Sequence, residues 1–424
     1  MRHISAVIFL VLALVVPWLM SQPEKAQVLF STIQQAGDGL ASVILSHNPK
    51  TVAEIKANYN DKRELFESNR PAKKVKILLV PGHEPNYGGA EYGSLKEREM
   101  TVELADGLKE FLSKNSRYEV FVARSKESWS PTFQNYFTKE WKDIVAWKDG
   151  HKSELEHLTK AGDFHPTLPS VIHNSAPTDV ALRLYGLGKW ANENDVDIIL
   201  HIHFNDYPGH GNLPGKYSGL TIYVPQKQYF NSATTQSLAK DILKRLNKYN
   251  PISNLPGESA GIVQDQNLIA IGAYNSVDAA SMLIEYGYIY EPQFTNSNIH
   301  DTAIKDLAFQ TYLGLQDFLD NNSALSSSGY FDTLVMPYTW NKPIADNKAN
   351  ANDVYALQTA LVFDGVYPPQ GKTFSDCPRT GSVGACTVSA IEDFQNRRGI
   401  RGEKGVAGRK TLEELNKSFG VKAI

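Results

Sequence analysis

Four residues have side chains that could bind a metal ion or move a proton, and each lies beside a short apolar segment. His83, His203 and Glu285 each stand at the end of an apolar run, and Glu97 begins an amphipathic segment. Two imidazoles and one carboxylate, with a fourth position open to water, are the protein ligands of a catalytic zinc ion. A second carboxylate would then be free to act as a base. The four residues therefore predict a zinc-assisted hydrolytic site, provided that the fold brings them together.

Each of these residues also has a purely structural interpretation. Glu97 completes an S-x-x-E capping box with Ser94, which would make it a helix-capping residue and not a ligand. His83 could be a polar loop residue, and His203 a hydrogen-bonded histidine near a strand end. Glu285 is harder to explain structurally, because a carboxylate buried without a partner is costly. The residues alone leave these alternatives open.

A fifth candidate, His201, faces the same side of its strand as His203, because side chains alternate along a strand. It could bind the metal, support a ligand or be a core histidine. Four further histidines show no compact ligand spacing, and we expect them at the surface: His151, His157, His165 and His173.

These candidates need a fold that gathers strand ends, and the sequence indicates one. Short apolar runs alternate with amphipathic segments from residue 74 onward, which is typical of an α/β domain with a largely parallel sheet flanked by helices. The carboxyl ends of such strands form one rim, where ligands gather. The expected strands are 75–80, 118–123, 197–202, 220–224 and 281–285, and the expected helices are 95–112, 180–192, 237–249 and 304–319.

Residues 127–177 interrupt this alternation and form an expected insertion without a strong helical or strand period. Because we expect 118–123 to run beside 75–80, the insertion should begin at the rim of the site. It has too many large apolar side chains for a plain solvent loop: Trp129, Phe133, Tyr136, Phe137, Trp141 and Trp147. Long loops in compact domains are often lids. We therefore expect the insertion either to cover a substrate groove or to pack against residues 23–72.

The chain begins with an apolar run, 4–20, that follows Arg2 and His3. Its length and position indicate a signal anchor or a cleaved signal peptide over 1–22, and either would export the rest of the chain. Residues 23–72 are expected to form a helical stalk beside the membrane. The protein is therefore expected in the cell envelope, anchored in the membrane or, alternatively, secreted.

The composition excludes several classes of protein. Of the 424 residues, 42% are hydrophobic and 21% are charged, and the net charge is −3. These values exclude collagen, disordered tails and multi-span membrane proteins. There is no basic excess that would point to nucleic acid as a partner. Two cysteines are too few for a disulfide scaffold.

Four short motifs carry a family resemblance, and they follow one another in the order PGH at 81–83, LKEREM at 95–100, HIHFN at 201–205 and LIEYG at 283–287. Together they resemble the zinc-dependent N-acetylmuramoyl-L-alanine amidases, and the likeness covers about 74–320 around the insertion. The resemblance implies that His83, Glu97 and His203 are zinc ligands, which favours the metal role over the capping role for Glu97. It also implies that Glu285 is the catalytic carboxylate.

Three positions depart from the family pattern. Val80 stands where an Asp usually precedes the PGH motif, and Glu84 stands where a second Gly usually follows it. His201 replaces a residue that is usually small. Because these positions lie beside the implied ligands, we expect them to affect how the ligands are held.

The last part of the chain, 345–424, resembles the three-helix peptidoglycan-binding module. The likeness rests on an LQ pair at 357–358, an FQ pair at 394–395 and the segment 405–412. Three helices are expected in it, over 354–363, 388–397 and 410–419.

Two further features belong to this part of the chain. A linker over 321–344, which contains the polar run NNSALSSS, separates the module from the domain over 73–320, so few contacts should cross it. Cys377 and Cys386 lie nine positions apart in one loop of an exported chain, and we expect them to form a disulfide.

With this resemblance, the sequence predicts an exported cell-wall hydrolase that cuts the amide bond between N-acetylmuramic acid and L-alanine in peptidoglycan. Zinc would be its cofactor, peptidoglycan its substrate and binding partner, and the membrane a partner through the N-terminal segment. Two alternatives are a zinc carboxypeptidase that acts on stem peptides and a non-catalytic wall-binding scaffold built on an amidase fold. The products released from the wall distinguish the three.

Overall fold

The structure is a computed structural model that describes residues 47–61, 72–173, 175–320 and 335–420. The chain divides into two compact units, 1–48 and 49–424, and the second unit contains all the elements discussed below. The expected signal anchor over 1–22 lies outside the described residues, as does most of the expected stalk. Within the described ranges, every helix is too short or too polar to cross a membrane.

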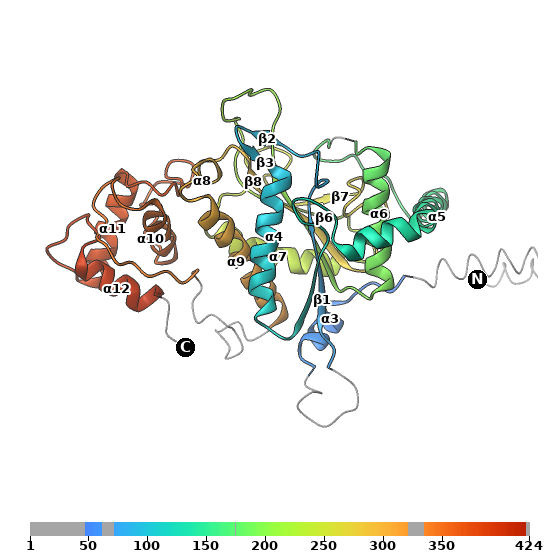
Figure 1. Cartoon of the computed structure of the whole chain (residues 1–424), viewed down its shortest axis with the longest axis horizontal. Helices are drawn as coiled ribbons and strands as arrows, with labels where there is room; N and C mark the ends of the chain where they lie inside the picture. The colour runs from blue at the N-terminus through green and yellow to red at the C-terminus, as the bar shows by residue number, and fades with distance from the viewer. Residues whose placement is uncertain (1–46, 62–71, 174, 321–334, 421–424) are drawn as a thin grey trace, which may run out of the picture. The chain divides into compact units, whose positions relative to one another are not determined.

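The central element is a six-stranded sheet with the strand order β4-β1-β5-β8-β6-β7 (Figure 1). Its strands are β1 (Val75–Pro81), β4 (Tyr118–Val122), β5 (Ile198–Asn205), β6 (Thr221–Pro225), β7 (Ile262–Asp265) and β8 (Ala280–Tyr288). β4, β1, β5 and β8 are parallel, whereas β6 is antiparallel to β8 and parallel to β7. The expected α/β fold with a largely parallel sheet is confirmed, and so is the pairing of β4 with β1. A separate two-stranded sheet pairs β2 (Glu91–Tyr92) with β3 (Leu95–Lys96).

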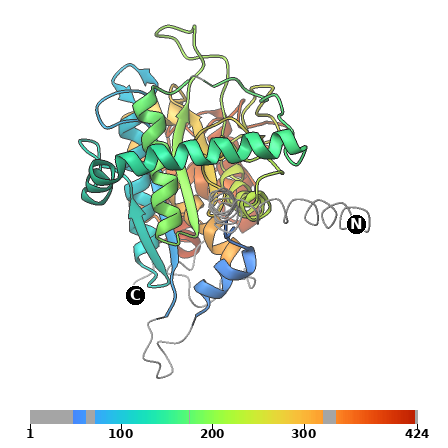
Figure 2. The same ribbon diagram turned by 90° about the vertical axis from the view of Figure 1, so that its right-hand side faces the viewer.

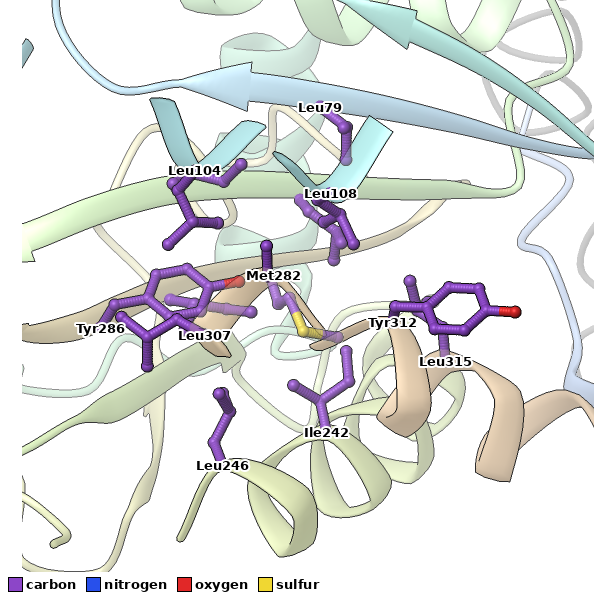
Figure 3. Packing of buried hydrophobic residues seen from close by; sticks show 14 of the residues in the cluster. Leu79, Leu104, Leu108, Ile242, Leu246, Met282, Tyr286, Leu307, Tyr312 and Leu315 are labelled. Carbon is purple, nitrogen blue, oxygen red and sulfur yellow. The ribbon is translucent and has the colours of Figure 1, made fainter. Parts of the chain in front are cut away.

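Helices cover both faces of the sheet, because the side chains of each buried strand alternate between the faces. The helices of this region are α3 (Val52–Tyr59), α4 (Glu97–Ser113), α5 (Pro131–Ala161), α6 (Thr178–Glu193), α7 (Ser232–Asn247), α8 (Pro292–Thr295) and α9 (His300–Leu319). Ile77 and Leu79 of β1 pack with α4, α7 and α9, and Figure 3 shows part of this core. Leu78 and Val80 pack with α5 and α6 on the other face. Both faces of β1 are thus buried, which fits its continuous apolar sequence.

The expected insertion over 127–177 is mainly one long helix, α5, which Figure 2 shows crossing the view in front of the sheet. Our expectation of a segment without a period is therefore wrong. The buried residues Phe133, Phe137, Ile144 and His151 recur every four or seven positions, which is a helical spacing. The many aromatic residues on other faces of the helix obscured this stripe.

The aromatic side chains of α5 pack against α6. Phe133 contacts the Trp190 ring at a centroid distance of 4.8 Å. Gly186 of α6 gives Phe137 and Ile144 room, because a Cβ at that position would lie 2.9 Å from each. The expected packing against the stalk is thus not observed among the described residues, where α3 instead packs Ile55 into the opposite layer of the core.

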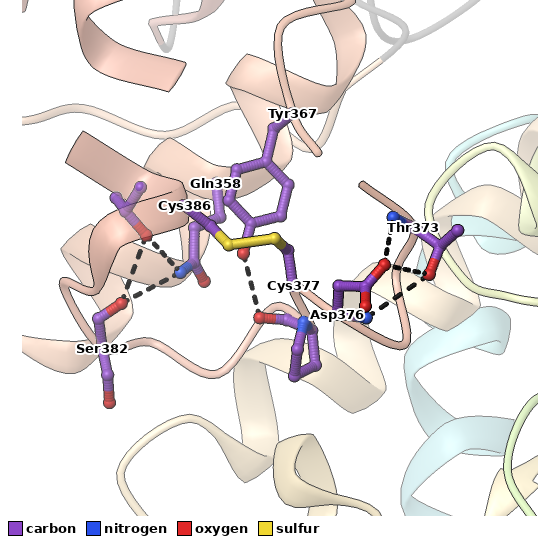
Figure 4. The surroundings of a disulfide bond; sticks show 9 residues. Gln358, Tyr367, Thr373, Asp376, Cys377, Ser382 and Cys386 are labelled. Atoms are coloured by element: carbon purple, nitrogen blue, oxygen red, sulfur yellow. Dashed lines mark hydrogen bonds between the residues drawn. A yellow bond between two sulfur atoms is a disulfide. The ribbon is translucent and has the colours of Figure 1, made fainter. Parts of the chain in front are cut away.

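The C-terminal region contains the three expected helices, α10 (Ala351–Phe363), α11 (Ala385–Arg398) and α12 (Arg409–Phe419). Trp340 and Ile344, from the segment that we expected to be a linker, are buried in the core of this helical region. The expected disulfide between Cys377 and Cys386 is present, with a Cα–Cα distance of 6.0 Å (Figure 4). It closes the loop between α10 and α11.

That loop also carries Arg379, a buried cation that binds groups of the sheet domain. Its guanidinium donates to Asp306 Oδ2 at 2.8 Å, to the Tyr249 carbonyl at 3.1 Å and to Asn250 Oδ1 at 3.0 Å. It also donates to Thr359 Oγ1 at 2.6 Å within the helical region. The polar linker had led us to expect few contacts between the helical region and the sheet domain. A sequence pattern does not reveal which distant polar groups a buried arginine will bind, so these contacts could not be predicted.

Replacing Arg379 by Leu is expected to lower the free energy of unfolding by about 3–5 kcal/mol. Asp306 is 1% exposed and would lose its cation without gaining access to water. Urea unfolding of the purified variant measures the effect. Arg409→Leu is the matched control, because the pair of Arg409 with Glu413 is largely exposed, so the control should change little. Equal effects of the two substitutions would contradict a structural role for the buried pair.

Candidate metal centre

The loop after β1 holds His83 in an unusual backbone conformation beside β5. The backbone N–H of Gly82 donates to the Ile202 carbonyl at 2.9 Å, which ties the loop to β5. Only glycine fits at position 82, because a Cβ there would overlap the His203 ring. His83 itself has a φ of 68°, a left-handed conformation that is rare for residues other than glycine. These constraints place the His83 and His203 rings 4.9 Å apart between centroids.

Glu97 lies in the first turn of α4 and points toward both histidines. Its Oε1 accepts hydrogen bonds from His203 Nδ1 at 3.0 Å and from the Phe204 N–H at 3.1 Å, and its Oε2 accepts from the Ala90 N–H at 2.8 Å. The cap residue of α4 is Lys96, with no side-chain cap bond. The alternative of an S-x-x-E capping box is therefore wrong, and the Glu97 carboxylate is directed into the site.

His203 and Glu285 lie side by side on neighbouring strands, since they are register partners of β5 and β8. Both residues lie within their strands, which extend further than the expected ranges 197–202 and 281–285. Glu285 Oε2 is buried and has no hydrogen-bond partner among the described residues. The four residues singled out from the sequence are thus brought together.

Three of these residues fit a metal ion. His83, Glu97 and His203 each offer one ligand atom, and these atoms all lie within 4.8 Å of one another. His83 Nε2 is 2.8 Å from Glu97 Oε1 but lacks the alignment of a hydrogen bond, so it is buried without a hydrogen-bond partner in the described chain. Ligand atoms from two imidazoles and a carboxylate that converge in this way, one of them a buried nitrogen without a hydrogen-bond partner, suit a divalent cation.

The electrostatics of the site agree with this fit. Burial and the charges of Glu97 and Glu258 raise the pKa of Glu285 well above its usual value. Burial also acts to raise the pKa of Glu97, but His83 and His203 outweigh it and lower that pKa below its usual range. Burial lowers the pKa of His203, which favours the neutral imidazole that metals bind. A cation next to Glu285 would favour its charged form.

His201 does not join this group. Burial and the neighbouring His203 lower the pKa of His201 to about 3, and the ring bonds to the backbone of Ala270. His201 is 4% exposed, so its neutral ring is a hydrogen-bonded histidine of the core. Of the three interpretations of this residue, the structure favours the core histidine.

The histidines of the insertion are not all at the surface. His157, His165 and His173 are exposed, as expected. His151 is 7% exposed, and its Nδ1 bonds to the Tyr274 carbonyl. The expectation failed for His151, because it lies on the buried stripe of α5.

Sequence reasoning missed two charged residues that hold the site. Arg124 is 2% exposed and donates to the carbonyls of Pro81 and Gly82, which precede His83. Its position directly after an apolar run is a signal that could have identified it, because the other strand ends also carry site residues. Arg124 thus supports the loop on which His83 lies.

Glu258, the second missed residue, is 1% exposed and has several buried donors around it. It accepts hydrogen bonds from Asn205 Nδ2 at 2.8 Å, from the Tyr223 hydroxyl at 2.7 Å and from the Tyr288 hydroxyl at 3.1 Å. It lies in a loop without motif or period, so the sequence carried no signal for it. Its contacts join the ends of β5 and β8 to the middle of β6.

Comparisons with solved structures give matches that cover somewhat over half of this chain. The CwlD amidase from Clostridioides difficile, solved in complex with the GerS lipoprotein, is 16% identical, with 58% of this chain and 98% of that chain covered and a TM-score of 0.39. An N-acetylmuramoyl-L-alanine amidase from Clostridium difficile 630 is 16% identical, with 59% and 99% covered and a TM-score of 0.37. The N-acetylmuramyl-L-alanine amidase Ami1 from Mycobacterium smegmatis is 13% identical, with 58% and 96% covered and a TM-score of 0.39.

The family assignment rests on a comparison with family models. No curated protein matches the chain. Residues 350–415 match the model of a putative peptidoglycan-binding domain. Residues 77–317 match the model of N-acetylmuramoyl-L-alanine amidases, and this match spans more than half of the chain and all four site residues. The chain therefore belongs to the N-acetylmuramoyl-L-alanine amidase family.

Proposed function

We propose that the metal held by this amidase is zinc, with His83, Glu97 and His203 as its ligands. The chain is a peptidoglycan amidase by its family, and a location in the cell envelope or outside the cell fits that activity. The observation that carries the proposal is the convergence of three ligand atoms within 4.8 Å of one another, next to a buried carboxylate. Two histidines and one glutamate, with a position left for water, are a frequent zinc set.

In this proposal, Glu285 is the group that moves protons. Zinc, when bound, supplies a Lewis acid that lowers the pKa of water and polarises the substrate carbonyl. Glu285 accepts a proton from the water as the water oxygen bonds to the lactyl carbonyl carbon. As the carbon–nitrogen bond to L-alanine breaks, Glu285 gives this proton to the leaving amine nitrogen. The buried Oε2 of Glu285, on the strand beside His203, supports this role.

We assign roles to the other parts of the chain from the family matches and from the sequence. We infer that the catalytic domain spans 73–320 and that the helical region within 345–424 holds the enzyme on peptidoglycan. Residues 1–22 would anchor it in the membrane, since their apolar run follows a basic residue. Fractionation of cells that produce the chain with and without 1–22 tests the anchor, and recovery of both forms in the soluble fraction would contradict it.

Digestion of purified cell wall tests the activity. The full chain is expected to release whole stem peptides with a free L-alanine amine, and a zinc chelator should abolish the release until zinc is added back. Mass spectrometry of the products makes the measurement. Loss of a terminal amino acid would instead indicate a carboxypeptidase, and no release at all would indicate a wall-binding scaffold.

A further inference from the structure

We propose that Glu84 is a positioning residue that holds His83 in place for metal binding. This inference rests on the proposed metal role of His83 and goes beyond it. Glu84 directly follows His83 and is 5% exposed. A buried carboxylate is costly unless its oxygens are satisfied.

Both oxygens of Glu84 are satisfied, and by two different elements. Oε2 accepts a hydrogen bond from Trp129 Nε1 at 3.0 Å, just before α5 begins. Oε1 accepts from Arg183 Nε of α6 at 2.7 Å, in an ion pair that is largely shielded from water. Glu84 therefore joins the loop that carries His83 to α6 and to the segment just before α5.

The two donors are themselves fixed. The Trp129 ring lies edge-on to the Phe137 ring with centroids 5.0 Å apart, which locks it to the buried stripe of α5. The Arg183 guanidinium also donates to Asp179 and, at 3.3 Å, to the Tyr87 hydroxyl. A donor that cannot move defines where its acceptor must lie, so the position of the Glu84 carboxylate is set from outside the loop.

His83 needs such support because its backbone conformation is unfavourable. A residue with a Cβ in the left-handed region persists only when its surroundings hold it there. On the N-terminal side of His83, Arg124 donates to the carbonyls of Pro81 and Gly82. On its C-terminal side, Glu84 accepts from Trp129 and Arg183. His83 is thus held on both sides, which directs its Nε2 toward the other ligand atoms.

Zinc titration of the metal-free protein in competition with a chelating indicator tests this inference. Glu84→Gln is expected to weaken zinc binding about 10- to 100-fold, as loss of a group that orients a ligand typically does. The Gln amide nitrogen can only donate, so one of the two donors would lose its acceptor. Trp129→Phe keeps the ring packing, removes one N–H and should weaken binding by less.

The double variant sharpens the test. If Trp129 acts through Glu84, the Glu84→Gln/Trp129→Phe variant should bind zinc as weakly as Glu84→Gln alone, because coupled residues are not additive. Asp317→Asn is the matched control, since Asp317 forms a partly buried ion pair with Arg245 between α9 and α7, far along the chain from the site. This control should bind zinc as the unchanged protein does.

The possible results distinguish the positioning role of Glu84 from the proposed ligand set on which it rests. The absorption spectrum of the Co²⁺-loaded protein should change in Glu84→Gln and not in Asp317→Asn, because it reports the ligand geometry and not the overall stability. Zinc affinity of both Glu84→Gln and Trp129→Phe within about twofold of the unchanged protein would overturn the role of Glu84, given the expected loss. If His83→Ala also left the affinity unchanged, the proposed ligand set itself would fail.

Discussion

The Glu285→Gln variant is expected to bind zinc and cell wall normally but to lose at least about 10²-fold in turnover. Gln has nearly the same shape as Glu, so the packing of β8 should be kept. It cannot accept the proton of water or pass one to the leaving amine. The raised pKa of Glu285, caused by burial and by Glu97 and Glu258, shows that the charge state of this position depends on its surroundings.

Release of stem peptides from purified wall measures this loss, together with zinc content and sedimentation with wall. Glu103→Gln is the matched control, because Glu103 is also a carboxylate but forms ion pairs with Lys126 and His300 and is not one of the four site residues. The control is expected to keep its activity. Turnover of Glu285→Gln within a few-fold of the unchanged enzyme would remove Glu285 from the proton-transfer role.

His83→Ala and His203→Ala are each expected to lose bound zinc, whereas His201→Ala should keep it. The first two remove one of three ligand atoms that lie within 4.8 Å of one another. His201 is outside this group and bonds to the backbone of Ala270, so its loss should affect packing rather than metal content.

Metal analysis of the purified variants decides this prediction. Because His201 and His203 lie on the same strand and face, His201→Ala controls for general damage to β5. A loss of zinc from His201→Ala as complete as that from His203→Ala would show that the ligand on this strand has been assigned to the wrong histidine. Thermal unfolding of the metal-free forms shows whether the substitutions also change stability.

The sequence was sufficient for the parallel part of the sheet and for the meeting of the site residues. Buried parallel strands are continuous apolar runs, and β1, β5 and β8 have such runs with polar residues near their ends. It was not sufficient for the direction of β6, since an apolar strand of a few residues has no feature that encodes its direction, and it did not indicate β7 at all. That direction depends on the connections and on packing with the whole sheet.

The role of Glu97 illustrates the same limit at the level of one residue. The local sequence S-x-x-E at 94–97 fits both a capping role and a metal-binding role for Glu97. What separates them is the distance from Glu97 to His203, a residue more than a hundred positions later that reaches it only through the pairing of β1 with β5. The donors to Glu84 and Glu258 were hidden for the same reason, because they are contributed by distant segments.

The order of the strands also governs when the enzyme can become active. His83 and Glu97 flank the connection from β1 to α4, whereas His203 comes from β5 and Glu285 from β8, at the far end of the matched segment. Contacts between segments so far apart in the chain form late in folding and cooperatively. Closing the long loops between them costs conformational entropy before the contacts can stabilise the fold. An incompletely folded chain would therefore offer no site to a metal ion. A newly made chain would be harmless to the wall around it until its central strands had paired, and uptake of the metal would then stabilise only the finished fold.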